Sequence, residues 1–598
     1  MSLDKTNQLF GAPIIWRSQP LTGGLNNRYQ AQYIKDDQAS ELFNVDLDDV
    51  TRPKARDGYL VLAGSTAAMQ ASITSSLLTK RIAGLAYLHT TYDTKKMVIA
   101  IDDGSSGKVY WRTDMTSAGY WTEALVTTTV SFAVNTADAP IFQVNDGLLI
   151  IPAAATNVHS MDNAGALYDG GNTNTSPPRG AVDGCAFLSR AWLLKQGTTG
   201  NPPELHYSKL LPSATSPSTM WNRDGVSVSP LLAGRLQLAA DRGGQAIACK
   251  PWNEVSIMVF FTNCIEEILV FNSDPQDGSI RRVIEDHIGC SSRDSVISVG
   301  QEMFFADQFG QIRSLQQTVS AAQGGVVPQP LSEPIAGELP GKLNQQYRNK
   351  IRCTRFRDRL FVAYPRLGAT EANAVAVYHL GRKIWESIWL LKHPLGRWLV
   401  SDIRGSGDDL WFSDGSTATS GRDATATPKI YRLFSQTYSD DGFPITYTET
   451  TKAFDIGVPE ADKIWDGYEA EARGSDGVIM ETGVRFDEDS GFHDLEGAVV
   501  ISKPGGSFPI LATDFPLTPA DFPLVAGATV LARKRQSLYG VTGTDSEDAP
   551  ESRSRTAQLQ ITSVNTGKQF QRAGYRLWCR VQKNEGVDWL TEKLQQET

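Results

Sequence analysis

Short apolar segments joined by tight polar turns recur along the middle of the chain. One unit runs through residues 82–88, 97–101 and 109–111, with a turn at 102–104. Another places Asn145-Asp146-Gly147 between the apolar residues 141–144 and 148–151. An Asx-Gly turn between two apolar segments is typical of a β-hairpin. The pattern therefore predicts antiparallel strands, and helical periodicity is almost absent.

The hairpin unit occurs seven times between about residues 80 and 435. The average spacing, about 50 residues, lies in the range of propeller blades. A sheet of this size cannot bury both faces alone, but radial stacking packs each sheet against two neighbours. The fold class predicted from the sequence is mainly β, with a β-propeller of six to eight blades over 76–440.

The two flanks of this region have a different character. Residues 1–75 are extended and rich in turns, whereas residues 441–585 alternate apolar and polar positions. Period-2 alternation indicates an antiparallel sheet with one wet face. We therefore predict a C-terminal β-sandwich or platform to which the N-terminal arm contributes a strand, followed by a tail at 586–598. The strands expected in the platform start near Ile445, Trp465, Gly477, Ala557 and Ala573.

The charge balance argues against a protein that grips nucleic acid. The chain has 67 acidic and 57 basic residues and a net charge of −10. Phosphate binding usually requires a basic excess. An acidic balance suits a passage through which DNA slides without adhering, and it equally suits ordinary solubility.

The six cysteines are scattered and form no zinc-ligand pattern. We expect buried, reduced thiols, as in a protein that folds in a reducing cytoplasm. There is no secretory pattern at the start of the sequence and no apolar run of about 18 residues, so we expect neither secretion nor a spanning helix.

Catalytic motifs are missing from the sequence. It has no phosphate-binding loop, no nucleophile elbow and no zinc-protease helix, and its seven histidines are isolated. We expect no enzyme activity, no cofactor and no metal. The acidic segment from Asp487 to Glu496 resembles a cation loop, but Gly491 stands at the fifth position, where calcium needs a ligand, so a solvated turn is the better interpretation.

A resemblance to a known family rests on motifs in a fixed order. Residues 20–27 read Pro-Leu-Thr-Gly-Gly-Leu-Asn-Asn, residues 44–46 read Asn-Val-Asp, and residues 56–59 read Arg-Asp-Gly-Tyr. This resembles the N-terminal signature of phage tail and neck proteins, the nozzle or tail tubular protein B family of short-tailed phages. Glycines supply the positive φ that such turns need.

Later segments are similar to the propeller of the same family. They are Tyr207-Ser208 with Trp221, residues 288–297, residues 303–314 and residues 448–457. The signature residues, all expected to be structural, are Gly23, Gly24, Leu25, Asn26, Asn44, Asp46, Arg56, Gly58, Tyr59, Tyr207, Ser208, Trp221, Gly289, Arg293, Gly310 and Arg313.

The resemblance implies a structural virion protein, made in the bacterial cytoplasm and assembled into the tail. In this family a homo-oligomeric ring, usually of six copies, continues the portal-adaptor channel. It carries tail fibres or spikes, retains the packaged double-stranded DNA and conducts it during ejection without sequence-specific contact, and the chain itself does not insert into a membrane.

Two alternatives of other classes stay open. One is a receptor-binding or glycan-processing propeller of the sialidase type, which needs three arginines, a tyrosine nucleophile and carboxylates around one pocket. The other is a cellular scaffold propeller that binds peptides.

Overall fold

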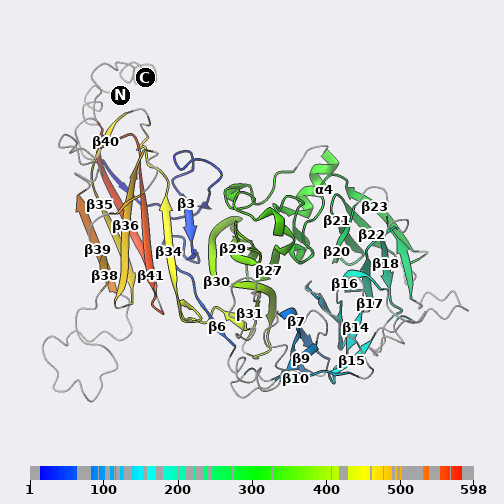
Figure 1. Ribbon diagram of the computed structural model, residues 1–598. Coiled ribbons are helices and arrows are strands. Elements are labelled where there is room, and N and C mark those ends of the chain that lie inside the picture. The colour runs from blue at the N-terminus through cyan, green and yellow to red at the C-terminus, as the bar shows by residue number, and fades with distance from the viewer. Residues whose placement is uncertain are drawn as a thin grey trace, which may run out of the picture. The chain divides into compact units, whose positions relative to one another are not determined.

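The computed structural model describes most of the chain between residues 14 and 581 (Figure 1). Within these limits it leaves out 63–81, 92, 102–107, 114, 116–120, 127–137, 152–157, 170–178, 198–201, 211–220, 222–232, 239–243, 272–274, 277, 325–327, 406, 416–428, 458, 460, 476, 488–491, 495–497, 502–529, 538–552 and 566. The predicted tail at 586–598 lies outside the described residues.

The chain divides into two compact units. The sandwich unit comprises 1–59, 382–390 and 435–598, and the propeller unit comprises 60–381 and 391–434. These limits correct the boundaries predicted at residues 75 and 440. The propeller begins earlier because Leu62 already donates its N–H to the Ile430 carbonyl of the last blade. The segment 382–390, which the sequence assigned to the propeller, joins the other unit because Asn44 bonds to it.

The described residues of the propeller unit form seven blades, a number within the predicted range of six to eight. The first four are sheets of four or five strands, antiparallel except where β11 pairs in parallel with β15. Blade 1 contains β7 (Ile82–His89), β8 (Lys95–Ile101), β9 (Lys108–Arg112) and β10 (Thr122–Glu123); blade 2 contains β12 (Ile141–Val144), β13 (Gly147–Ile150), β14 (His159–Met161), β15 (Ala166–Asp169) and β11 (Leu125–Val126). Blade 3 contains β16 (Ala181–Phe187), β17 (Arg190–Lys195), β18 (Glu204–Tyr207) and β19 (Gly234–Gln237); blade 4 contains β20 (Ala246–Trp252), β21 (Ser256–Phe261), β22 (Ile265–Val270) and β23 (Ser279–Glu285).

The last three blades are less regular. Blade 5 has β24 (Ile297–Val299), β25 (Glu302–Ala306) and β26 (Ile312–Ser314), followed by the helix α4 (Leu315–Gly324). Blade 6 has β27 (Arg352–Phe356), β28 (Arg359–Tyr364) and β29 (Ala372–His379). Blade 7 has the second half of β30 (Ile384–Ser401), then β31 (Asp409–Asp414) and β32 (Ile430–Leu433). Short 3-10 helices precede blades 5 and 6 as η2 (Arg293–Ser295), η3 (Glu333–Ile335) and η4 (Gln345–Lys350).

Blades 1 to 4 each pack both of their faces on their neighbours. In β8, Met97 and Ile99 lie in a core shared with Trp411 of blade 7, whereas Val98 lies in a core shared with Leu148 of blade 2. Successive residues of a strand point to opposite faces of its sheet. A blade packed between two others is buried on both faces, so its strands must be apolar at every position. This explains why the blade strands read as apolar runs and the platform strands as alternating ones.

The sandwich unit consists of two mostly antiparallel sheets. The first contains β39 (Val530–Ser537), β35 (Lys463–Gly474), β42 (Phe570–Val581), β5 (Lys54–Ala55) and β4 (Val45–Asp46), with β1 (Ile14–Arg17) on β42 and β40 (Arg553–Ser554) on β35. The second contains β33 (Ser439–Asp440), β34 (Phe443–Thr451), β41 (Ala557–Asn565), β36 (Val478–Phe486) and β37 (His493–Asp494), with β38 (Val499–Ile501) on β36 and β3 (Gln38–Phe43) on β34; β2 (Gly24–Leu25) pairs with β3, and β6 (Tyr59–Val61) pairs with β33.

Contacts between the two sheets are buried and partly polar. Arg572 of β42 and Glu449 of β34 form an ion pair with a Nε–Oε2 distance of 2.9 Å. Their side chains are at most 1 % exposed, and the Tyr447 hydroxyl donates to the same carboxylate oxygen. The predicted sandwich, with strands supplied by the N-terminal arm, is confirmed by the pairing of β1 and β5 with β42 and of β3 with β34.

Candidate functional site

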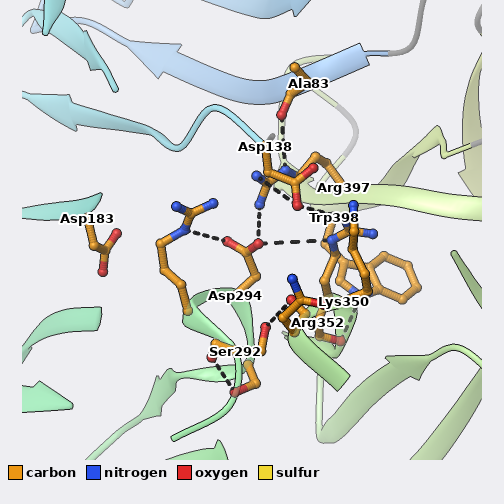
Figure 2. A network of polar contacts seen from close by, with 12 residues as sticks. Ala83, Asp138, Asp183, Ser292, Asp294, Lys350, Arg352, Arg397 and Trp398 are labelled. Atoms are coloured by element: carbon orange, nitrogen blue, oxygen red, sulfur yellow. Dashed lines mark hydrogen bonds and ion pairs between the residues drawn. The ribbon is translucent and has the colours of Figure 1, made fainter. Parts of the chain in front are cut away.

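A cluster of charged side chains lies where the inner strands of the propeller converge (Figure 2). It draws on all seven blades through side chains or backbone carbonyl groups. The contributors, from blade 1 to blade 7, are the Ala83 carbonyl, Asp138, Asp183, Lys250, Arg293 with Asp294, Arg352, and Arg397. We call this set the axial cluster.

Asp294 is the central acceptor of the axial cluster. Its Oδ2 accepts from Nη1 of Arg397 at 2.5 Å and lies 4.0 Å from Nε of Arg352. Its Oδ1 lies 3.4 Å from Nε of Arg293, the residue that precedes it in η2. Figure 2 shows the Asp294 carboxylate pointing toward Arg397 and Arg352. One carboxylate thus connects blades 5, 6 and 7.

Asp138, just before β12, forms the second bridge. Its Oδ2 is 2.9 Å from Nη2 of Arg352 and 3.5 Å from Nη2 of Arg397. Both arginines also donate to backbone carbonyl groups, Arg352 to Leu395 and Arg397 to Ala83. Each guanidinium is therefore held from several directions, which fixes its orientation.

Two further pairs flank this centre. Lys250 of β20 contacts Asp183 of β16 at 3.0 Å, and the same carboxylate accepts the backbone N–H of Cys249 at 2.9 Å. Lys350 contacts Glu371 at 3.1 Å next to Arg352. Figure 2 places Asp183 across from Asp294.

The ionisation of the axial cluster follows from its pairing. Burial alone raises the pKa of Asp294, but the positive charges of Arg397 and Arg293 outweigh it and hold that pKa well below its usual range. Burial lowers the pKa of Lys250, but Asp183 outweighs it and raises that pKa above its ordinary value. These groups are therefore charged at neutral pH.

The axial cluster borders a cavity of about 280 Å³ in the propeller unit. Lys250, Arg293, Arg352 and Arg397 form its cationic lining, and Asp183 and Asp294 its anionic lining. The rest of the wall is largely apolar and comprises Leu85, Ala139, Pro140, Ile141, Phe142, Gly184, Val296, Ile297, Cys353 and Trp398. A wall of this mixed kind suits a small ligand with one charged end.

A second polar centre gathers the N-terminal signature residues in the sandwich unit. Arg56 is fully buried, and it makes two parallel bonds to Asp440, with Nη1–Oδ1 at 2.8 Å and Nη2–Oδ2 at 2.6 Å. Its Nε donates to Oδ1 of Asn44 at 2.9 Å, and further bonds reach the carbonyl groups of Asp57 and Leu390. All five guanidinium donors have acceptors.

Asn44 joins the same centre to two other segments. It has a φ of 55°, and its Nδ2 donates to the Thr446 carbonyl at 2.8 Å. Its Oδ1 also accepts from the Leu390 N–H at 2.8 Å, and its own N–H donates to Ile388. The N-terminal arm, the segment 382–390 and β34 are thereby tied together. We call Asn44, Arg56, Leu390 and Asp440 the arginine hub.

Two glycines of the signature sit where the backbone of another segment leaves no room. A Cβ on Gly24, which has a φ of +65°, would lie 2.3 Å from the carbonyl oxygen of Trp385. A Cβ on Gly58 would lie 1.9 Å from the carbonyl oxygen of Ser439. Real Cβ atoms do not approach this closely, so both positions require glycine.

The other N-terminal signature residues surround the hub. Tyr59 is fully buried and pairs in parallel with Asp440. Leu25 is buried, and Asn26 donates to the side chain of Gln38 at 3.0 Å. Gly23 lies against the side chains of Asp37 and Gln38, and Asp46 contacts Lys54 at 3.3 Å.

The later signature residues belong to blades 3 and 5. In blade 3, the Tyr207 ring lies 5.3 Å from that of Trp192, and the Ser208 hydroxyl accepts the N–H of Ala191 at 2.9 Å. Trp221 is buried in the core shared by blades 2 and 3.

In blade 5, Arg313 pairs with Asp307 at 2.6 Å, and Gly310 has a φ of 82°. Gly289, just before that blade, packs against the backbone of Thr262. Arg293 alone of these later residues reaches the axial cluster.

The chain matches no family model and no curated protein. It is similar to solved structures, among them the CNH domain of AfRom2, with 9 % identity, a TM-score of 0.34, and coverage of 59 % of this chain and 94 % of that one. Virginiamycin B lyase from Staphylococcus aureus gives 11 % identity, a TM-score of 0.33 and coverage of 59 % and 94 %. BBS1N, solved in complex with ARL6DN, gives 11 %, 0.33, and coverage of 63 % and 97 %. The similarity concerns the β-propeller fold and says nothing about activity.

The axial cluster differs from a glycan-processing site in two chemical respects. It brings three arginines and several carboxylates together, but none of the described residues that line the cavity is a tyrosine. The three arginines also bind carboxylates of the protein itself. A sialidase needs its arginines for the substrate carboxylate and a tyrosine as nucleophile.

Metal and membrane features are also lacking in the part of the chain that the structure describes. No three His, Cys, Asp or Glu side chains are grouped as metal ligands there. Of the expected acidic loop, Asp487 accepts the backbone N–H groups of Arg555 and Thr556, each at 2.8 Å, and its remaining acidic members lie outside the residues whose side chains are described. No described helix combines the length and the apolarity that a bilayer crossing requires.

Sequence reasoning missed the axial cluster except for Arg293. Its members lie up to 314 residues apart, from Ala83 to Arg397, so only the closed ring brings them together. One signal was present: most of the charges stand at or just before the inner strand of a hairpin unit, as Arg352 does at the start of β27.

Proposed function

We propose that this chain is the nozzle subunit of a short-tailed bacteriophage, a structural protein that assembles as a homo-oligomeric ring. In this proposal the ring, of six copies, continues the portal-adaptor channel, carries fibres or spikes and conducts double-stranded DNA during ejection.

The arginine hub is the observation that carries the proposal. The motifs 23–26, 44–46 and 56–59 are separate in the sequence, yet Gly24, Asn44, Arg56, Gly58 and Tyr59 all pack on segments 385–390 and 439–446. Weak motifs whose residues meet in one buried contact network are a stronger family signature than the same motifs would be if they lay apart in the fold.

The small axial cavity supports a passage between copies and not through a single propeller. A cavity of about 280 Å³ accepts a small molecule and excludes a DNA duplex. The conduit would therefore be the lumen of the ring. The net charge of −10 per copy favours sliding over adhesion in such a lumen.

Native mass measurement and negative-stain imaging of the purified protein test the proposal. We expect rings with a central hole and a mass of six 65.3 kDa chains. A protein that stays monomeric with and without a portal-adaptor complex would contradict the proposal. Turnover of a fluorogenic sialoside would instead favour the glycan-processing alternative.

A further inference from the structure

The axial cavity has two chemically distinct walls. Lys250, Arg293, Arg352 and Arg397 bring four cationic groups to its wall. Phe142, Ile297 and Trp398, with further aliphatic side chains, supply an apolar surface. Such a combination binds a ligand with an anionic head and an apolar body, because each part finds a matching surface.

The axial cluster carries one positive charge more than its carboxylates neutralise. The four cations lie against three carboxylates, those of Asp138, Asp183 and Asp294. Including the neighbouring pair of Lys350 and Glu371 adds one charge of each sign and leaves the surplus unchanged. An uncompensated charge in a buried place is unfavourable, so an incoming anion is favoured there.

Arg293 has a donor that remains available for a ligand. Its Nη1 donates to the Val182 carbonyl at 2.8 Å, and its Nε faces Asp294. Its Nη2 has no partner among the described residues, and the side chain is 19 % exposed. By contrast, Arg352 and Arg397 are nearly buried and held on two sides. Arg293 can therefore receive a ligand without giving up its own bonds.

We propose that the axial cavity is a binding site for a small organic carboxylate. The carboxylate accepts from Nη2 of Arg293 and faces Lys250, and its apolar part lies against Phe142, Ile297 and Trp398. This site is independent of the nozzle function, since it lies inside one propeller unit and needs no second copy.

Isothermal titration of the full-length protein with benzoate tests the site. Benzoate offers a carboxylate on a flat apolar ring, benzamide is its neutral counterpart, and inorganic phosphate is an anion without an apolar part. We expect benzoate to bind with a Kd of about 1 mM or lower and the other two probes to bind at least about tenfold more weakly. Equal binding of benzoate and benzamide, equal binding of phosphate, or no benzoate binding would overturn the proposal.

Two variants locate the binding. Arg293→Gln and Lys250→Gln should each weaken benzoate binding about tenfold or more, while Arg281→Gln should leave it unchanged. Arg281 is a matched control because it also donates to a backbone carbonyl, that of Gln237, but lies on the outer strand β23. A folded Arg293→Gln protein that binds benzoate like the wild type would overturn the assignment. If neither variant folds, the difference between the affinities of the wild-type protein for benzoate and for benzamide tests the proposal.

Discussion

Arg56 is buried as a complete ion pair and not as an isolated charge. Its planar guanidinium matches the Asp440 carboxylate, and the other donors reach an amide oxygen and two carbonyl groups. Lysine cannot reproduce this fork of five donors. The residue is specified by geometry as well as by charge.

Replacing Arg56 should therefore destabilise the sandwich unit strongly. Arg56→Ala leaves Asp440 buried without its partner, and we expect a loss of about 3–5 kcal/mol in the free energy of unfolding. Arg56→Lys should still lose about 2 kcal/mol, because at least two hydrogen bonds disappear. Guanidinium titration followed by circular dichroism measures both.

The exposed pair of Arg580 and Asp466 provides the control. Arg580 is also bidentate to its carboxylate, but the two side chains are 46 % and 28 % exposed. Arg580→Lys should cost less than about 1 kcal/mol. If the two Lys variants lose the same amount, the hub is not a special centre of stability.

A methyl group at Gly58 should be nearly as harmful as the loss of the arginine. The added Cβ would lie 1.9 Å from the Ser439 carbonyl oxygen, and backbone cannot turn away as a side chain can. We expect Gly58→Ala to cost at least about 2 kcal/mol in the free energy of unfolding. Gly574→Ala is the matched control, since its nearest atom would be 3.5 Å away. A neutral Gly58→Ala would refute the close approach.

At the scale of elements, neighbouring blades share their apolar cores. Five of the apolar cores join residues of two adjacent blades. The axial cluster adds ion pairs between blades that are not consecutive, as between Asp138 of blade 2 and Arg352 of blade 6. The propeller is therefore held together by ion pairs across its centre as well as by apolar contacts between adjacent blades.

We expect acid to weaken the ion pairs of Asp294 and so to lower their contribution to stability. The pKa of Asp294 is lowered in the folded protein, so its contribution is fully present above the unfolded value of about 3.9 and declines as the pH falls below it. At pH 7, Asp294→Asn should cost about 3 kcal/mol in the free energy of unfolding, and the deficit should shrink at pH 3. Urea titrations at both pH values give the comparison.

Asp93→Asn is the control for Asp294. Asp93 is 82 % exposed and contacts His89 and Lys95 in blade 1. Its replacement should change the free energy of unfolding by less than about 1 kcal/mol at pH 7. A deficit of Asp294→Asn that grows between pH 7 and pH 3 would contradict the assignment.

The hairpins were predictable from sequence because their signals are local. The Asn145-Asp146 turn, with Asn145 at a φ of 50°, joins β12 and β13 as expected, and the seven sequence units coincide with the seven blades. For the arginine hub, the sequence indicated the separate motifs but not the contacts between them, because Asp440 lies 384 residues from its partner Arg56. The segment 382–390 was assigned to the wrong unit because β30 is one continuous strand that serves both units.

At the scale of the whole molecule, the chain passes between the two units four times. The sandwich unit takes β1 to β5 from the N-terminal arm and its main strands from beyond residue 435. Neither flank is therefore a domain in its own right. The sandwich exists only when distant parts of one chain meet.

Removing residues 1–59 should consequently unfold the sandwich and spare the propeller. A chain that begins at Leu60 keeps Leu62 and its bond to Ile430, but it loses Arg56 and the strands β1 to β5. Limited trypsin digestion with mass spectrometry should show resistant fragments from the propeller unit and rapid cleavage beyond residue 435. Equal resistance of the C-terminal part in the shortened and full-length chains would contradict this prediction.

The bond between Leu62 and Ile430 has a consequence for synthesis on the ribosome. Leu62, near the start of the propeller, bonds to a partner that is synthesised about 370 residues later. At about 5–20 residues per second, this wait lasts roughly 20 to 70 s, while early blades can already form from local hairpins. The nascent chain therefore carries an incomplete propeller, in which the first and the latest blade each expose one apolar face. Chaperones that cover apolar surface should act on it until blade 7 emerges.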